Sequence, residues 1–421
     1  AQAASGVEIA AASGTGGGAA QPASAAASRT GARAVNFVPA TPIPRILRLR
    51  PRLRVTDIAA PAPEAFSSVH TTSFPTLLRE LRCSLLVTTF QAGRVIVMRP
   101  QQDSINTHFF ALPRPMGLAA DANRLFVGAH RSVHEYRNVP AVAPRVDPPN
   151  AHDAVYLLRN VHVTGHVDIH EMAFAGNDCW YVNTLFSCLC TLDTEHSFVP
   201  RWRPRFVSGY APEDRCHLNG LAMGDGKPRY LTALGESNVR EGWRGDKRTG
   251  GVLLDVESGE VVARGLSMPH SPRLHRGRLW VLESGRGALS TVDPVSGRVE
   301  AVAQVPGFTR GLDFVGPIAF IGLSQLRSSN PFTDIPLTDQ NPDRSSGVWA
   351  VNVETGQTVA FLRFSASVEE IFAVQALPGI LSPLILEEHD PILDSTWAIP
   401  DELLPQVELA KTGAADPPAT T

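Results

Sequence analysis

Three histidines stand at corresponding places near the starts of short apolar strands: His170, His217 and His270. They lie in the segments "IHEMAFA", "HLNGLAM" and "PHSPRLH". Imidazoles held by separate rigid elements supply nitrogen ligands and leave a coordination position open, which suits a divalent transition metal such as zinc, copper, iron or manganese. Water bound to such an ion loses a proton near neutral pH and becomes a nucleophile or a base. We therefore expect a shared metal or substrate site, while the alternative for each histidine alone is a hydrogen-bonded structural role.

Other polar residues occupy the same place in neighbouring repeats. One residue per repeat aligns there: Met116, His170, Asn219, His270, Arg310 and Glu369. His217 lies two residues before Asn219, so both point to the same side of an extended strand. Arg310 is always charged and needs an anion, either a neighbouring glutamate or a carboxylate or phosphate of a ligand. We expect Arg310 to orient the substrate, Asn219 to bind it, and Glu369 or Glu370 to act as a base or fourth ligand.

Two loops are longer than a hairpin needs, and both join the second strand of a repeat to the third. They cover residues 235–251 and 324–347. Loops of this length are commonly functional, and their cations favour an anionic or carboxylate-bearing ligand. The substrate-binding residues expected on the first loop are Arg240, Trp243 and Arg244. Tyr210, in the segment before His217, is expected to assist catalysis.

The elements that must position these residues recur every 40 to 60 residues. Each repeat reads as four short antiparallel strands separated by Gly, Asp or Asn turns, which predicts an all-β, six-bladed β-propeller. The sixth repeat has only its inner strand, beginning at Val368, and its other strands come from "SLLVTTF", "RVIVMRP" and "THFFALP" near the N-terminus. The ring is therefore expected to close with N- and C-terminal strands in one blade. A capped amphipathic helix is expected in "TTSFPTLLRELRCS".

Composition sets the domain limits and excludes some classes of partner. Residues 1–66 are predicted to be a disordered Ala/Ser/Gly-rich extension and a Pro/Arg linker, 67–404 the propeller, and 405–421 a flexible tail. A formal net charge of -3 over 421 residues gives no electrostatic footprint for nucleic acid. No apolar run of eighteen residues is present, so no membrane span is expected. Composition does not predict an oligomeric state.

Five cysteines in so long a chain do not form a disulfide framework. A reducing compartment is favoured, which indicates a cytoplasmic protein and leaves secretion open. A cross-strand bridge between Cys179 and Cys190 is geometrically possible. Two small buried hydrophobic residues are the alternative that we favour.

The run from "EDRCHLNGLAMGDGKPRYLTAL" to "SMPHSPRLHRGRLWVLESGRG", followed by "PGFTRGLDF" and "VEEIFAVQ", resembles an uncharacterised bacterial family of conserved hypothetical proteins that is defined only as a domain of unknown function. The resemblance covers residues 74–378 and implies a fold without a reaction. The expected architecture is also similar to propeller lactonases, which bind a metal through Glu, Asn and Asp. It is similar as well to peptidyl-hydroxyglycine lyases, whose zinc is held by three His with Arg and Tyr assisting. The residues present are more like the second arrangement, by analogy of composition alone.

Two functions follow from this pattern. The first is a metal-dependent hydrolase or lyase that acts on a small anionic or peptide-terminal substrate at the mouth of the central channel. The second is a non-catalytic propeller that binds a protein or glycan partner on the same face, through Trp243 and the long loops.

Overall fold

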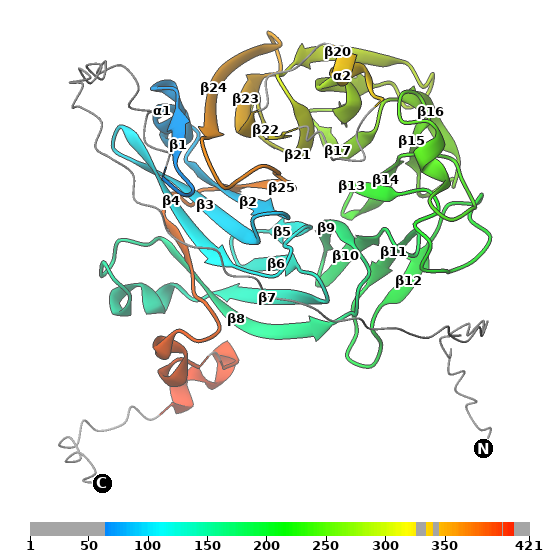
Figure 1. The fold of residues 1–421 in the computed structure, drawn as a ribbon. Helices are drawn as coiled ribbons and strands as arrows, with labels where there is room; N and C mark the ends of the chain where they lie inside the picture. The colour runs from blue at the N-terminus through cyan, green and yellow to red at the C-terminus, as the bar shows by residue number, and fades with distance from the viewer. Residues whose placement is uncertain (1–63, 326–333, 340–344, 398, 408–421) are drawn as a thin grey trace, which may run out of the picture. The chain divides into compact units, whose positions relative to one another are not determined.

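The computed structural model describes residues 64–325, 334–339, 345–397 and 399–407. The chain divides into two units, residues 1–60 and 61–421, and all the described residues belong to the second. The strands of this unit form six antiparallel sheets of at least four strands each, arranged as the blades of a propeller (Figure 1). The innermost strands contact one another all the way round, in the order β5, β9, β13, β17, β21 and β25. The predicted six-bladed propeller is therefore confirmed.

Five blades are built from consecutive strands. The first contains β5 (Leu118–Ala120), β6 (Arg124–Gly128), β7 (Ser132–Asn138) and β8 (Ala154–Val163). The second contains β9 (Ile169–Ala175), β10 (Asp178–Asn183), β11 (Cys188–Thr191) and β12 (Val199–Trp202). The third contains β13 (Leu218–Gly224), β14 (Lys227–Ala233), β15 (Gly251–Asp255) and β16 (Val261–Leu266). The fourth contains β17 (Pro269–His275), β18 (Arg278–Glu283), β19 (Ala288–Val292) and β20 (Val299–Gln304). The fifth contains β21 (Phe308–Val315), β22 (Ile318–Ser324), β23 (Ser346–Asn352) and β24 (Gln357–Phe364).

The closing blade joins the two ends of the domain. Its strands, from the centre outward, are β25 (Ala373–Pro378), β2 (Cys83–Thr89), β3 (Arg94–Gln101) and β4 (Ser104–Ala111). The register places Val87 opposite Val374. Closure by N- and C-terminal strands is thus as predicted, but the inner strand begins at Ala373 and not at Val368.

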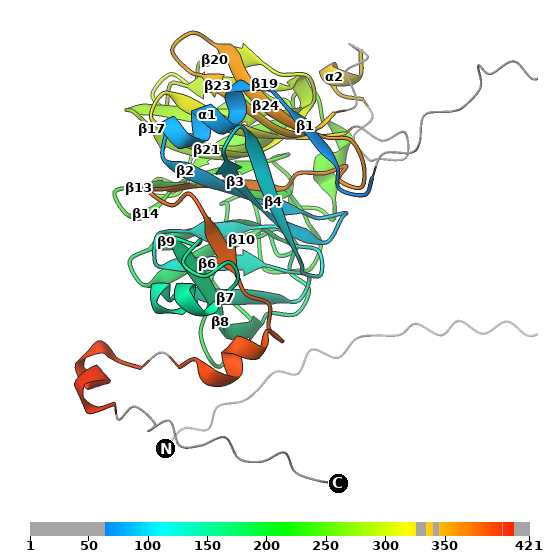
Figure 2. The same cartoon turned by 90° about the vertical axis from the view of Figure 1, so that its left-hand side faces the viewer.

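Two short strands extend blades beyond four. β1 (Ser68–His70) adds to β24, and β26 (Pro383–Ile385) pairs in parallel with β8. The predicted helix is α1 (Ser73–Glu80), which lies beside the closing blade (Figure 2). It buries Phe74 and Leu78 in a cluster with residues of that blade and of the fifth blade. Its N-cap residue makes no side-chain capping bond, unlike the prediction. The remaining helices are α2 (Pro336–Asp339), η1 (Pro140–Arg145), η2 (Gly242–Gly245), η3 (Ser284–Arg286), η4 (Pro391–Ser395) and η5 (Asp401–Gln406).

Most of the core lies between neighbouring blades, where the faces of adjacent sheets interdigitate. Inner strands approach closely at glycines. Gly311 has φ +79, and a Cβ added there would lie 2.6 Å from the backbone nitrogen of Val374 in the next blade. Only a residue without a side chain satisfies both conditions.

A repeated hydroxyl contact ties successive blades together near one mouth of the channel. A Ser or Thr on or just after the second strand of one blade donates to a backbone carbonyl at the inner strand of the next. The four pairs are Thr88 to Met116 (2.6 Å), Thr184 to Leu218 (2.5 Å), Ser284 to Thr309 (2.5 Å) and Ser324 to Ile371 (3.0 Å). These bonds fix the inner strands at the level where the predicted site residues lie.

All five cysteines are buried and unpaired. The closest recorded sulfur pair is Cys188 with Cys190, at 3.4 Å, so the alternative Cys179–Cys190 bridge is not formed. In the described part of the chain, none of the helices has the length and apolar character needed to cross a membrane. The predicted extension over 1–66 and tail over 405–421 lie mostly outside the described residues.

Candidate ligand site at the channel mouth

The structure brings four predicted residues to one end of the central channel. His170, Asn219 and His270 are the second residues of β9, β13 and β17, and Arg310 is the third of β21. His170, Asn219 and His270 are 7%, 3% and 3% exposed. A polar cluster this deep is costly unless its groups have partners, so each partner matters for the function.

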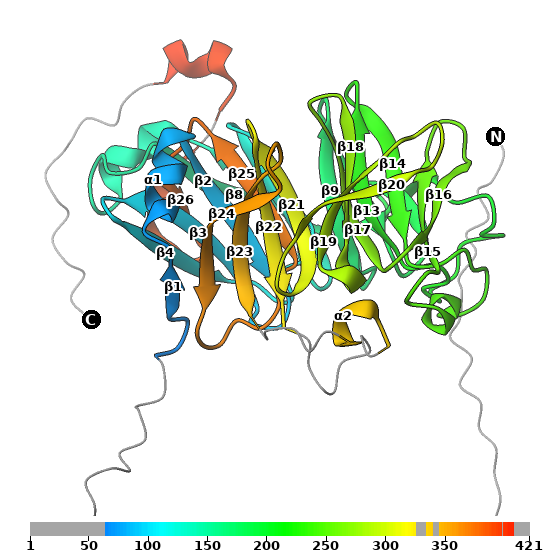
Figure 3. The ribbon, with the colours of Figure 1, turned by 90° about the horizontal axis from the view of Figure 1, so that it is seen from above.

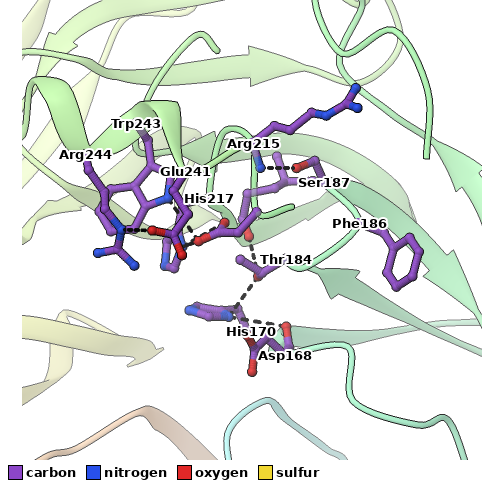
Figure 4. A network of polar contacts seen from close by, with 12 residues as sticks. Asp168, His170, Thr184, Phe186, Ser187, Arg215, His217, Glu241, Trp243 and Arg244 are labelled. Carbon is purple, nitrogen blue, oxygen red and sulfur yellow. Dashed lines mark hydrogen bonds and ion pairs between the residues drawn. The ribbon is translucent and has the colours of Figure 1, made fainter. Parts of the chain in front are cut away.

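His170 is held in one tautomer by its surroundings. Its Nδ1 lies 2.8 Å from Oγ1 of Thr184 and 3.3 Å from the carbonyl oxygen of Asp168 (Figure 4). The Thr184 hydroxyl already donates its proton to Leu218, and a carbonyl can only accept. Nδ1 of His170 must therefore donate, which leaves the lone pair on Nε2.

His270 repeats this arrangement in blade four. Its Nδ1 lies 2.9 Å from Oγ of Ser284 and 3.0 Å from the carbonyl oxygen of Met268, and the Ser284 hydroxyl donates to Thr309. Burial, with the charges of Arg310 and His217, lowers the pKa of His270 well below its ordinary value. The pKa of His170 is lowered in the same way, by burial first and then by His217 and Arg310. Both rings are neutral at pH 7 and present a lone pair on Nε2.

His217 differs because a carboxylate holds it. It immediately precedes β13 with a left-handed φ of 49°, and its Nδ1 donates to Asp214 at 2.9 Å. Nε1 of Trp243 donates to the same carboxylate at 2.9 Å. The imidazole packs on the Trp243 ring at 4.5 Å and meets the edge of His170 at 4.7 Å between centroids. Figure 4 shows this group beside the His170–Thr184 pair.

Among the described residues, no carboxylate contacts the charged group of Arg310. Its guanidinium lies 3.5 Å from the ring centroid of Phe372, and that ring also lies 5.0 Å from His170. Nε is sealed from solvent without a hydrogen-bond partner, and no ion pair of Arg310 is recorded within the described residues. Burial lowers the pKa of Arg310 to about 10, against the opposing charges of Glu370, Glu171 and Asp168.

Asn219 also has a donor to spare. Its Oδ1 accepts from the Thr232 hydroxyl at 2.6 Å, but its buried Nδ2 has no partner among the described residues. Unsatisfied donors from Asn219 and Arg310 and free acceptors on two imidazoles together form a set that a polar ligand can complete.

A buried ion pair crosses the channel below this mouth. Arg273 of β17 donates to Glu171 of β9 at 2.9 Å and to the carbonyl of Leu221 in β13 at 3.1 Å. Beyond it, a cavity of about 340 Å³ is lined by residues from all six inner strands, including Asp313 and Gln375. The pair separates that cavity from the histidine end, so the mouth has a floor.

The two long loops pack against each other over the same face. Trp243 of the first loop joins Ile335 and Leu337 of the second in one buried apolar cluster. Arg248 of the first loop pairs with Asp334 at 3.0 Å and with Asp339 at 2.7 Å. Figure 3 shows α2, from the second loop, on this side of the ring. Both loops join second to third strands as predicted, although much of the second lies outside the described residues.

The glutamates do not occupy the predicted strand position. Glu369 and Glu370 precede β25 by four and three residues, and Phe372 takes the place next to His170 and Arg310. The reason is the start of the inner strand, which is set by pairing with β2 from the other end of the chain. Glu370 still acts on Arg310 through its charge.

Several other predicted residues lie away from the open site. Trp243 is 3% exposed and serves as a wall behind His217, so it offers no surface to a glycan or protein. Arg244 is paired with Glu241 at 2.7 Å, and Arg240 lies 4.0 Å from Glu213. Tyr210 is 51% exposed, and its ring lies under Arg203, which is not one of the predicted site residues.

Sequence reasoning missed Phe372 and the two hydroxyls that orient the imidazoles. A signal for the hydroxyls exists, because the second strands end in "CWYVNT", "RLWVLES" and "IAFIGLS", each with a terminal Ser or Thr. Within the described residues, no group of three or more His, Cys, Asp or Glu is arranged to hold a metal ion. The three histidines are thus neighbours without being a preassembled metal centre.

Comparisons with known proteins add a family. A family profile described as "Domain of unknown function (DUF4915)" matches residues 72–386. No curated protein matches. Similar solved structures include a nidogen/laminin complex (9% identity, TM-score 0.45, covering 70% of this chain and 99% of that chain). A protein of unknown function from Bacteroides caccae is similar too (10% identity, TM-score 0.44, with the same coverage).

Proposed function

We propose that this chain, which belongs to the DUF4915 family of unknown function, is a hydrolase or lyase that acts on a small anionic substrate at the channel mouth. The observation that carries the proposal is the orientation of three neighbouring imidazoles. Each donates from Nδ1 to a fixed acceptor, so each keeps Nε2 for a ligand. A hydrogen bond from Nδ1 orients a histidine so that its Nε2 can bind a metal or take up a proton.

The donor set is of the kind that a divalent transition metal takes. His170 and His270 are neutral, and His217 is backed by a carboxylate. The three are not preassembled. His217 lies on the segment before β13 and not within a strand, so we propose that an ion draws His217 onto the other two. Such an ion would supply Lewis acidity and lower the pKa of bound water.

The other residues have roles that follow from their charge. Arg310 holds the anionic group of the substrate, and Asn219 donates from Nδ2 beside it. Glu370, whose charge acts on Arg310, is the proposed base. The floor and the packed loops favour a small substrate or the end of a peptide.

Elemental analysis tests the metal. The purified full chain is incubated with zinc, copper, iron or manganese and dialysed, then compared with His270→Ala and His217→Ala. His196→Ala is the matched control, because His196 is exposed and pairs only with Asp193 on a surface turn. About one equivalent of one ion should remain in the native chain and the control and be lost in the other two. If the native chain retains no ion, the proposal that it binds a metal is wrong.

A panel of lactones and carboxylate esters tests the chemistry. Turnover that falls in His217→Ala and Arg310→Met, and not in His196→Ala, is the expected result. The non-catalytic alternative would be supported by two results together: no turnover of any compound in the panel, and stable binding of a partner protein or glycan to this face. The five unpaired thiols support a reducing compartment, so we also propose a cytoplasmic location.

A further inference from the structure

We propose that the channel mouth contains a recognition subsite for a small monocarboxylate that carries a hydroxyl or amino group next to the carboxylate. The inference rests on the proposed function in placing the substrate at this mouth, and it names the chemical class of that substrate. It is carried by unsatisfied donors and acceptors, independently of whether a metal binds.

The anion follows from Arg310. Its Nε is buried without a partner, and its guanidinium is stacked on Phe372 at 3.5 Å. A partly buried charge without an opposite charge in contact is unfavourable, so a ligand anion has more to gain here than at an exposed arginine. Because Phe372 covers one face of the guanidinium, the edge is left for binding, and the edge matches the two oxygens of a carboxylate.

Charge favours one negative charge over two. Three arginines of the first long loop and of the channel floor already have carboxylate partners: Arg244 with Glu241, Arg240 with Glu213, and Arg273 with Glu171. A phosphate dianion would need a second cation in contact with it, whereas a monocarboxylate is balanced by Arg310 alone.

The neighbouring group follows from the acceptors. Nε2 of His170 and of His270 each carry a lone pair at the level of Arg310, because Nδ1 of both rings donates. A ligand that was only a carboxylate would have no donor for these acceptors. A hydroxyl or amino group beside the carboxylate would donate to one of them, while Nδ2 of Asn219 would donate to the second carboxylate oxygen.

Calorimetric titration of the full chain with four probes tests the subsite. The probes are glycolate, acetate, glycolamide and inorganic phosphate, each added in EDTA and again with zinc. Glycolate should bind in EDTA, acetate about tenfold more weakly because one hydrogen bond is lost, and glycolamide and phosphate not measurably. Phosphate binding as tightly as glycolate, or acetate and glycolate binding equally, would overturn the class.

Three variants locate the binding. Arg310→Met keeps the packing on Phe372, removes the charge and should abolish glycolate binding. Arg310→Lys keeps the charge, loses the fork and should weaken binding at least tenfold. Arg205→Met is the matched control, since Arg205 is exposed and pairs with Glu260 on the rim of the ring, and it should bind normally.

The melting temperature of each variant reports its folding. Removal of a partly buried charge that has no ion pair should leave Arg310→Met at least as stable as the native chain. If Arg310→Met is less stable, Arg310→Lys replaces it as the test of binding. Glycolate binding that survives in Arg310→Met would overturn the subsite. Glycolate binding in EDTA by a chain that retains no metal would uphold the subsite and reject only the metal. If the chain retains a metal but does not bind glycolate, the metal site is upheld and the carboxylate subsite is rejected.

Discussion

At the scale of single residues, the mouth shows how a neighbour decides what a histidine can do. The same side chain is used twice as a neutral acceptor and once beside a carboxylate. For His170 and His270 the deciding partner is a hydroxyl whose own proton is committed to the next blade. Because each hydroxyl donates to the next blade, it can only accept from the histidine, and the ring proton must be on Nδ1.

The first prediction concerns pH and these two imidazoles. Their pKa values are lowered in the folded state, so below about pH 6.5 the unfolded chain binds protons that the folded chain refuses. Stability should be fully present above pH 6.5 and fall below it by about 1.4 kcal/mol per pH unit for each histidine. Urea unfolding from pH 8 to 5 measures the slope.

Two variants separate the imidazoles from the other titrating groups. His270→Gln should reduce the measured slope by about 1.4 kcal/mol per pH unit. His196→Gln should not flatten it, because Asp193 raises the pKa of His196 and gives it the opposite sign. A slope unchanged in His270→Gln would mean that His270 is charged in the folded protein.

At the scale of elements, the repeat predicted the blades because every unit has the same strands and turns. What it could not place was the start of the closing inner strand. A hairpin partner a few residues away fixes the register of the other inner strands, whereas β25 pairs with β2 across nearly the whole domain. Apolar residues run through "IFAVQAL", so sequence periodicity alone gives no register there. This is why the glutamates were predicted in the position that Phe372 occupies.

The second prediction separates the two roles of the hydroxyl contacts. Ser284→Ala and Ser324→Ala each remove a bond between blades and should each cost about 1 to 2 kcal/mol, measured by urea unfolding. Only Ser284 also faces an imidazole. In nitrogen NMR spectra, the His270 Nδ1–H signal should shift in Ser284→Ala, where only the Met268 carbonyl still accepts from it, and stay in place in Ser324→Ala. An unchanged His270 signal in both variants would show that Met268 alone orients the ring.

At the scale of the whole molecule, ring closure is what makes the mouth a site. The cluster draws residues from blades two to five and from the segment before β25, and none of the six blades holds it alone. The Arg273–Glu171 pair links β17 to β9 across the channel. Loss of any inner strand therefore removes support from partners on both sides, and the site and the fold should fail together.

Truncation of the closing strand tests this dependence. A chain ending at Phe372 keeps every strand of the five consecutive blades and loses β25, which pairs with β2 and contacts β21 and β5. The exposed edge of β2 and the lost packing on the inner strands β21 and β5 should abolish the cooperative thermal transition, since closure is what protects such edges. A chain ending at His389 retains β25 and β26 and should still melt cooperatively. If the shorter chain also melted cooperatively, within a few degrees of the longer one, the blades would be independently stable repeats, and the site would have to be explained by fewer of them.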